Sequence, residues 1–139
     1  MNVDCFLDTN ILVYAAAGRD VEETKRKSAL ELIEKEKFGI STQVLQEFYV
    51  TIVRRIEVPL STEQALEWIE LLTTFPCLSI DVAIVKMGIE FSKRYQISYW
   101  DGAILASAEA LGATTMYSED LNHEQLYNKV RVVNPFKVR

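Results

Sequence analysis

Short apolar segments alternate with longer helical segments along this 139-residue chain, and this alternation constrains its fold more than any other feature. Strands that alternate with helices favour a mostly parallel sheet with helices on both faces. The sequence therefore predicts the α/β class. In chain order we expect strands at 3–7, 39–42, 77–80, 114–117 and 130–133, and helices at 10–17, 22–37, 43–57, 62–74, 82–95 and 99–111.

Local signals support several of these boundaries. Gly18 and Gly112 each follow a helical segment, where a left-handed terminal residue is often needed. Gly39 is expected to separate a charged helix end from the strand residues that follow it. Ser61 and Gln64 form a capping-box pattern at the start of helix 62–74.

Length and composition indicate one domain that spans residues 1–139. With 49% hydrophobic residues, a chain of this size can bury about two-thirds of its extended surface in one core. No apolar stretch approaches the roughly 20 residues that span a bilayer, and the first residues lack the basic region of a signal peptide. We therefore expect a cytoplasmic protein without membrane contact, in which Cys5 and Cys77 are buried free thiols.

Four acidic residues fall where such a fold would bring them to one end of the sheet. Asp8 follows the first strand, Asp120 follows strand 114–117, Asp101 lies in the first turn of helix 99–111, and Glu47 lies inside helix 43–57. Ligands of open α/β sheets bind outside the carboxyl ends of the strands. We expect the four carboxylates to gather there.

Such a cluster predicts a metal ion and phosphate chemistry. Carboxylates a few Å apart raise each other's pKa unless a cation compensates their charge. Mg²⁺ prefers oxygen ligands and usually keeps several waters, so one or two direct carboxylates suffice. A bound Mg²⁺ would polarise a phosphoryl oxygen and lower the pKa of a water molecule, which suits phosphodiester hydrolysis.

Each acid also has an ordinary structural interpretation. Asp8 could cap the helix that follows it, and Asp101 completes a serine-x-x-acid capping pattern with Ser98. Asp120 lies in a polar turn. Glu47 falls on the more polar arc of its helix, so periodicity alone indicates a surface glutamate.

Other chemistries find less support. The net charge of −5 argues against capture of nucleic acid by the whole surface, so any phosphate site must be local. His123, the only histidine, lies in a polar loop where we expect solvent exposure, and no glycine-rich phosphate loop is present. Tyr99 and Trp100 either stack on a base near the acids or belong to the core. Three basic groups are either solvated helix faces or local phosphate contacts: 25–27, 54–55 and 93–94.

Four segments, taken in order, resemble the PIN-domain nucleases. They are residues 7–12 (LDTNIL), 46–48 (QEF), 99–103 (YWDGA) and 118–121 (SEDL), and residues 130–136 look like the family's closing strand. The chain is most similar to the toxin nucleases of VapBC toxin–antitoxin systems. The resemblance covers nearly the whole chain.

This resemblance implies a three-layer α/β/α sandwich around a mostly parallel sheet. It also implies a metal-dependent endoribonuclease that uses Mg²⁺ or Mn²⁺ to hydrolyse RNA through an activated water. Glu119 stands beside Asp120 and is an alternative to it at the metal. The implied catalytic and metal-binding residues are Asp8, Glu47, Asp101 and Asp120, supported by Thr9, Asn10 and Ser118.

The resemblance further implies a homodimer and a small antitoxin whose tail enters the acidic groove. Helix 62–74 carries an apolar stripe that includes Ala65, Leu66, Ile69 and Leu72, with Trp68 beside it. We expect this stripe to pack against the core and to lie near the antitoxin contact.

Three other functions use some of the same features. A DNA or flap nuclease could use the same acids, although such enzymes generally need further elements to clamp a duplex. A PIN fold without activity could serve only for binding. A receiver module of a signalling system would need paired acids after the first strand, whereas Thr9 and Asn10 follow Asp8 here.

Overall fold

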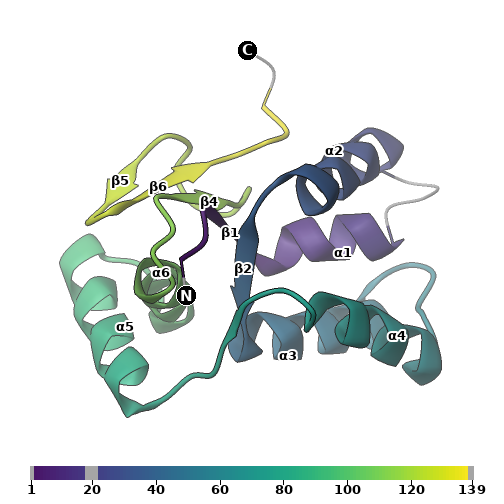
Figure 1. Ribbon diagram of the computed structural model, residues 1–139, viewed down its shortest axis with the longest axis horizontal. Coiled ribbons are helices and arrows are strands. Elements are labelled where there is room, and N and C mark those ends of the chain that lie inside the picture. The colour runs from purple at the N-terminus through teal and green to yellow at the C-terminus, as the bar shows by residue number, and fades with distance from the viewer. Residues whose placement is uncertain (1, 18–21, 138–139) are drawn as a thin grey trace.

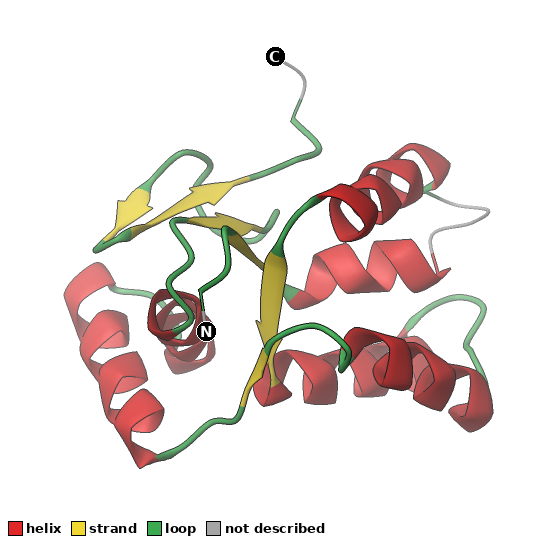
Figure 2. Cartoon of the chain, viewed as in Figure 1, coloured by secondary structure: helices red, strands yellow, loops and turns green. Residues whose placement is uncertain are grey.

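The computed structural model describes residues 2–17 and 22–137, so Gly18 lies outside the described residues. Within these ranges the strands form a six-stranded sheet with helices on both sides (Figures 1 and 2), which confirms the predicted α/β class. No helix in the described ranges is long and apolar enough to cross a lipid bilayer. The elements are β1 (Cys5–Leu7), α1 (Thr9–Ala17), α2 (Glu23–Lys35), β2 (Phe38–Ser41), α3 (Thr42–Val50), the π-helix η1 (Thr51–Arg55), α4 (Thr62–Leu72), β3 (Cys77–Leu78), α5 (Val82–Tyr95), α6 (Tyr99–Ala110), β4 (Thr115–Tyr117), β5 (Leu126–Tyr127) and β6 (Val130–Val133).

The strand order places three strand ends side by side. The order across the sheet is β3-β2-β1-β4-β6-β5, and every pair is parallel except β5 with β6. From β1 the chain continues to β2 and β3 on one side, and then returns to β4 on the other side of β1. In open α/β sheets this reversal of direction creates a crevice at the carboxyl ends of the strands. The carboxyl ends of β1, β2 and β4 therefore meet at one edge.

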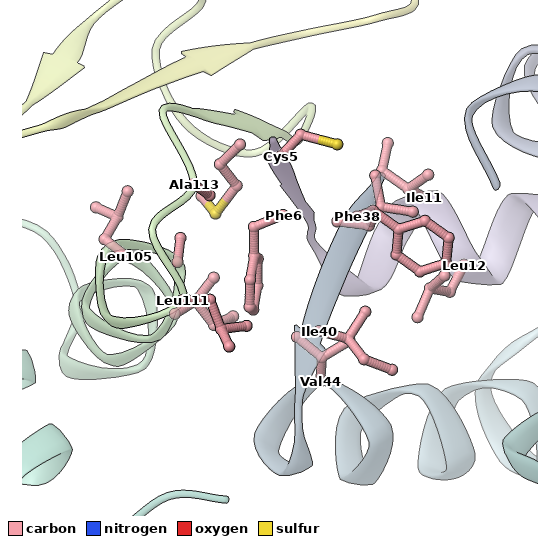
Figure 3. Close-up of a cluster of buried hydrophobic side chains, with 14 of the residues drawn as sticks. Cys5, Phe6, Ile11, Leu12, Phe38, Ile40, Val44, Leu105, Leu111 and Ala113 are labelled. Atoms are coloured by element: carbon pink, nitrogen blue, oxygen red, sulfur yellow. The ribbon is translucent and has the colours of Figure 1, made fainter. Parts of the chain in front are cut away.

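The central strands are buried on both faces, which holds these ends in place. Phe6 of β1 and Ile40 of β2 are fully buried, and Figure 3 shows them with Val44 of α3, Leu12 of α1 and Leu111. Each such side chain contributes roughly 1.5–3 kcal/mol when it leaves water. Helices α5 and α6 lie on one side of the sheet, and α1 to α4 lie on the other (Figure 1).

Helices α5 and α6 approach each other closely at Gly88 and Gly102. A Cβ atom built on Gly102 would lie 2.4 Å from the carbonyl oxygen of Gly88, which is backbone and cannot move aside. A Cβ atom on Gly88 would lie 2.9 Å from the Cα atom of Ala103. The first turn of α6, which carries Asp101, is therefore seated directly on α5.

Two other glycines differ in their roles. Gly112 has a φ angle of +82° after α6, as expected for a left-handed helix terminus. Gly39 does not separate a helix from a strand, because it lies inside β2 and pairs with Phe6. A Cβ atom there would meet Leu111 Cδ1 at 2.7 Å, so this glycine provides space for the helix layer.

Three local predictions differ from the structure. The helix expected at 43–57 is α3 followed by η1, and Leu60 folds back to donate a backbone hydrogen bond to the carbonyl of Ile52 at 2.9 Å. The sequence does not predict β5, a two-residue strand that pairs with β6. On α4 the capping box of Ser61 is present, but Leu66 is 52% exposed and does not join the buried stripe.

Both cysteines are free thiols, and only one is fully buried. Cys5 lies in β1, where loss of hydration raises the pKa of its thiol to about 12. Cys77 lies in β3 at the edge of the sheet and is half-buried. The expectation of two buried thiols is therefore correct for Cys5 and correct only in part for Cys77.

Candidate active site

Asp8 is the most buried of the four predicted acids, with 3% of its surface exposed. It follows β1 directly, and its backbone amide donates to the carbonyl of Tyr117 on β4 at 3.1 Å. Its Oδ1 atom accepts from the backbone amide of Thr9 at 2.7 Å, and its Oδ2 atom accepts from the Ser118 hydroxyl at 2.7 Å. The carboxylate is therefore fixed at the junction of β1 and β4.

The environment of Asp8 disfavours its negative charge. Burial raises the pKa of Asp8 from 3.8 to about 7, although the hydrogen bonds from Ser118 and Thr9 lower it. The neighbouring carboxylates of Asp120 and Glu47 raise the pKa further. A cation placed in this neighbourhood would favour the ionised form of Asp8.

Glu47 lies one and a half turns into α3 and faces the same region. Its Oε1 atom accepts from the Thr9 hydroxyl at 2.8 Å, and its Oε2 atom accepts from Gln43 Nε2 at 3.2 Å. Ser41 caps this helix, because its side chain accepts from the backbone amide of Val44 at 3.3 Å. The interpretation of Glu47 as a surface glutamate is therefore wrong, since both of its carboxylate oxygens are engaged.

Asp101 lies in the first turn of α6 and has two roles in the structure. Its backbone amide donates to the Ser98 hydroxyl at 3.1 Å, so the predicted cap of this helix is present. Burial raises the pKa of the half-buried Asp101 carboxylate, and a hydrogen bond with Ser98 lowers it. The carboxylates of Asp120 and Glu47 raise the pKa again, so the capped helix start is also part of the acidic cluster.

Asp120 follows β4 and is exposed at the rim of the cluster. Its backbone amide donates to the Ser118 hydroxyl at 3.1 Å, and its Oδ2 atom accepts from Asn10 Nδ2 at 3.0 Å. Ser118 is fully buried and therefore connects Asp8 with the loop that carries Asp120. The predicted supporting residues Thr9, Asn10 and Ser118 all bond directly to one of the four acids.

Glu119 points away from the cluster and is held by other partners. Its Oε2 atom lies 2.9 Å from Lys25 Nζ, and its Oε1 atom accepts from the Tyr14 hydroxyl at 2.5 Å. Lys25 also lies over the rings of Tyr14 and Phe136. The geometry thus assigns Glu119 to an ion pair with α2 and leaves Asp120 as the acid of this loop that faces the cluster.

Sequence reasoning missed two residues that shape the site. Gln43 is buried, and its Nε2 atom donates to Glu47 and also to the backbone carbonyl of Trp100 at 3.0 Å. Lys25 belongs to a basic run that reads as a solvated helix face. Gln43 stands four residues before Glu47, a spacing that brings two helical side chains together and could have indicated this contact. The partners Trp100 of Gln43 and Glu119 of Lys25 lie 57 and 94 residues away, so no local pattern indicates those contacts.

The donor set of this cluster fits a hard divalent cation. Asp120 and Glu47 each raise the pKa of both Asp8 and Asp101, so these two acids lie between Asp8 and Asp101 electrostatically and link them. Among residues 2–17 and 22–137, no group of three or more histidine, cysteine or acidic side chains is arranged to hold a metal ion as it stands. Mg²⁺ and similar ions need only one or two direct carboxylates and reach others through water, so oxygen ligands of the kind that this cluster offers suit them.

His123 has no part in this cluster. Its Nδ1 atom accepts from the backbone amide of Asn134 at 2.9 Å, and its side chain is 19% exposed. The expectation of a solvent-exposed histidine is wrong, because the loop folds over the chain segment that follows β6. A mechanism based on histidine has no support in this arrangement.

Comparison with known proteins places this chain in a family. Residues 5–129 match the family model of the PIN domain. The chain belongs to the PIN domain family. No curated protein matches its sequence.

Several solved structures share the PIN fold of this chain. A toxin–antitoxin complex from Klebsiella pneumoniae has a TM-score of 0.72 and 21% identity, and the match covers 97% of this chain and 100% of the other. VapC20 of Mycobacterium tuberculosis, described as a sarcin-ricin loop cleaving toxin, has a TM-score of 0.68 and 19% identity, over 84% and 90% of the two chains. DNA-bound VapBC from Salmonella typhimurium has a TM-score of 0.61 and 17% identity, over 94% and 96%. These likenesses extend over most of each chain and concern the fold.

The strand order of this PIN domain also differs from that of a receiver module. Receiver modules of the flavodoxin-like type have the order 2-1-3-4-5, whereas β1 here lies between β2 and β4, with β3 at the edge. The family match and this order together remove the receiver alternative.

A groove of 740 Å³ opens on this PIN domain beside α1, the start of α2, residues 56–60 and α4. None of the four acids lines it. Tyr14 lines the groove while its hydroxyl bonds to Glu119, so the groove adjoins the loop that carries Asp120. Its apolar lining includes Val13, Ala16, Ile56, Val58, Leu60 and Trp68.

Proposed function

We propose that this PIN domain is a metal-dependent endoribonuclease that hydrolyses phosphodiester bonds of RNA. The observation that supports the proposal most is the cluster in which Glu47 of α3 and Asp120 neighbour both Asp8 at the end of β1 and Asp101 of α6. An isolated cluster of this kind disfavours its own charge, and a divalent cation compensates for it. We expect the products to carry 5′-phosphate and 3′-hydroxyl ends.

Asp8 and Asp101 are the proposed direct ligands of Mg²⁺ or Mn²⁺, and Glu47 and Asp120 are proposed to act through water. When bound, the cation supplies positive charge that polarises a phosphoryl oxygen and lowers the pKa of water. The protein orients the ligands: Ser118 holds the Oδ2 atom of Asp8 at 2.7 Å. Thr9 and Gln43 hold Glu47 in the same way, and Asn10 holds Asp120. Such outer hydrogen bonds fix ligand direction and raise metal affinity.

The test compares Asp8→Asn and Asp101→Asn with Glu34→Gln, which changes an exposed acid on α2. The substrate is 5′-labelled single-stranded RNA, with Mg²⁺, Mn²⁺ or EDTA. The wild-type protein and Glu34→Gln should cleave only with metal, and the two Asn variants should lose at least about 100-fold in rate. Wild-type rates in both folded Asn variants would contradict the assignment of the site.

The same assay separates the remaining alternatives. Single-stranded and flap DNA substrates are run beside RNA at equal concentration. Cleavage of flap DNA in preference to RNA would favour a DNA-processing enzyme. Binding of RNA with no cleavage of any substrate in Mg²⁺ or Mn²⁺ would favour a PIN fold used only for binding.

We further propose that the chain is a homodimeric toxin whose small antitoxin partner occupies the groove beside α4. Of the stripe expected near the partner contact, Leu72 is fully buried and Leu66 is 52% exposed. Trp68 lines the groove, and Val58 beside it is exposed. An arginine of the partner would pair well with the carboxylate cluster, because guanidinium binds carboxylates with two parallel hydrogen bonds.

Co-purification tests the partner. The chain is expressed together with its neighbouring reading frame, and Val58→Asp in the groove is compared with Leu126→Asp. Leu126 is an exposed apolar residue on β5, which lies on the other side of the molecule from α4 (Figure 1). A small protein should co-purify with the wild type and Leu126→Asp but not with Val58→Asp. A monomeric wild type without a partner would refute this part of the proposal.

A further inference from the structure

Trp100 is a large exposed aromatic residue beside the acidic cluster. It is the second residue of α6, immediately before Asp101, and 62% of its surface is exposed. The other tryptophan of the sequence, Trp68, is half-buried and lines the groove at α4. An exposed indole gives up the large gain that its burial would bring, and tryptophan is enriched at surfaces that contact a partner.

The backbone and the ring of Trp100 are both held in place. Its carbonyl oxygen accepts from Gln43 Nε2 at 3.0 Å, and the same nitrogen donates to Glu47 at 3.2 Å. The ring of Tyr99 meets the indole edge-to-face at 5.0 Å between centroids. Gln43 therefore links the backbone of Trp100 to Glu47, and the indole stands on the residue next to Asp101 with Tyr99 against it.

The negative charge of the protein repels RNA phosphates, so a contact that does not depend on charge would help to hold RNA at this site. The chain has a net charge of −5, and the site itself consists of carboxylates. Lys25, the cation next to the loop of Asp120, is engaged by Glu119 and covered by aromatic rings. Stacking of a base on an aromatic ring does not depend on phosphate attraction and tolerates any base.

We infer that Trp100 is a stacking platform for one unpaired base of a single-stranded RNA substrate, next to the phosphate that is cleaved. This inference rests on the proposed function and adds to it a substrate class and a residue that binds it. Loss of one stacked base weakens binding by about 5- to 150-fold in other proteins. A duplex cannot use the platform, because its bases are already stacked and paired.

Kinetics and base deletion provide the first test. Trp100→Ala should raise KM for a short single-stranded RNA by about 5- to 150-fold and leave kcat within about twofold. Trp100→Phe should restore most of the loss. Leu66→Ala removes an exposed apolar side chain on α4 and should change neither constant. An RNA with an abasic nucleotide at the stacked position should bind wild type and Trp100→Ala with equal affinity. An abasic nucleotide at another position should leave the difference in affinity between the two proteins unchanged.

Fluorescence provides a direct readout without turnover. In the Asp8→Asn background, Trp68→Phe leaves Trp100 as the remaining tryptophan of the sequence. Its emission should be quenched as single-stranded RNA is added with Mg²⁺, with the same midpoint as fluorescence anisotropy of labelled RNA. The matched Trp100→Phe protein, which keeps Trp68, should show no quenching.

Three outcomes would overturn the inference, and they differ from one another. If wild type binds and cleaves RNA and Trp100→Ala has the same KM, the platform is wrong while the proposed function stands. If Trp100→Ala sediments as a smaller species than wild type, Trp100 packs against a second copy instead. If wild type neither binds nor cleaves single-stranded RNA, the proposed function fails and the platform fails with it.

Discussion

Asp8→Asn should stabilise the metal-free protein at alkaline pH. The ionised Asp8 carboxylate is disfavoured in the folded state, where its pKa rises from 3.8 to about 7. Between pH 4 and pH 7 the folded protein keeps a proton on Asp8 that the unfolded chain has lost. The stability of the wild type therefore falls as pH rises through this window and levels off above pH 7.

The size of the effect follows from the difference in pKa. A difference of about 3, at about 1.36 kcal/mol per pKa unit, is a cost of about 4 kcal/mol above pH 7. Asparagine removes this cost but loses the hydrogen bond that Ser118 donates to Asp8 Oδ2, which costs about 1 kcal/mol. The net gain of about 3 kcal/mol should raise Tm by roughly 10 °C for a chain of this size.

Calorimetry in EDTA at pH 5 and pH 8 measures this difference. Asp8→Asn should exceed wild type in Tm by roughly 10 °C at pH 8 and by much less at pH 5. Addition of Mn²⁺ at pH 8 should raise the Tm of the wild type more than that of the variant, because the cation compensates the charge of Asp8. A variant that is equally or less stable than wild type at pH 8 would refute the reasoning.

Three further changes should separate the roles of neighbouring residues. Glu119→Gln should keep RNA cleavage within about threefold of wild type, whereas Asp120→Asn should lose at least about tenfold, in the same assay of labelled RNA. Ser118→Ala removes a hydrogen bond that lowers the pKa of Asp8, so the affinity for Mn²⁺, measured by calorimetry, should fall by about tenfold or more. Unchanged affinity would exclude this orienting role of Ser118. Gly102→Ala places a methyl group 2.4 Å from a carbonyl oxygen of α5, so it should lower the free energy of unfolding by at least about 2 kcal/mol, measured by urea titration. A smaller loss would mean that α5 and α6 can move apart to accept the methyl group.

The positions of Asp8 and Asp120 could be predicted from the sequence because each follows a short apolar strand. Parallel strands align their carboxyl ends, so residues that follow different strands in the sequence lie near one another in the structure. A different local pattern predicted the cap at Asp101, since Ser98 precedes it by three residues. Local pattern was sufficient wherever the relevant partners are neighbours in the chain or adjacent strands.

Glu47 shows where local pattern fails. Helical periodicity places Glu47 on a polar arc, and that arc is indeed polar, but Glu47 itself is partly buried and contacts Thr9 at the start of α1. The hydrogen bond between them joins residues 38 apart in the sequence. Only the resemblance to a family indicated this position, because periodicity cannot tell a polar face that meets water from one that meets another polar residue.

Leu66 and β5 fail for related reasons. The apolar stripe of α4 predicts a buried face, but only part of that face meets the core, and Leu66 remains on the outer side. Strand β5 has two residues, too few for a period of two to be detected, and its pairing with β6 defines it. The exposure of Leu66 and the formation of β5 both depend on which other element of the fold packs or pairs with them.

The hydrogen bonds that join Asp8 to Ser118 and Asn10 to Asp120 each span 110 residues of the chain. During synthesis on a ribosome, the first aspartate of this pocket is made long before the partners that orient it. The acidic cluster cannot assemble until residues 118–120 have left the exit tunnel. A nascent chain that has not yet exposed these residues therefore lacks the complete acidic site, even though Asp8 has already been made.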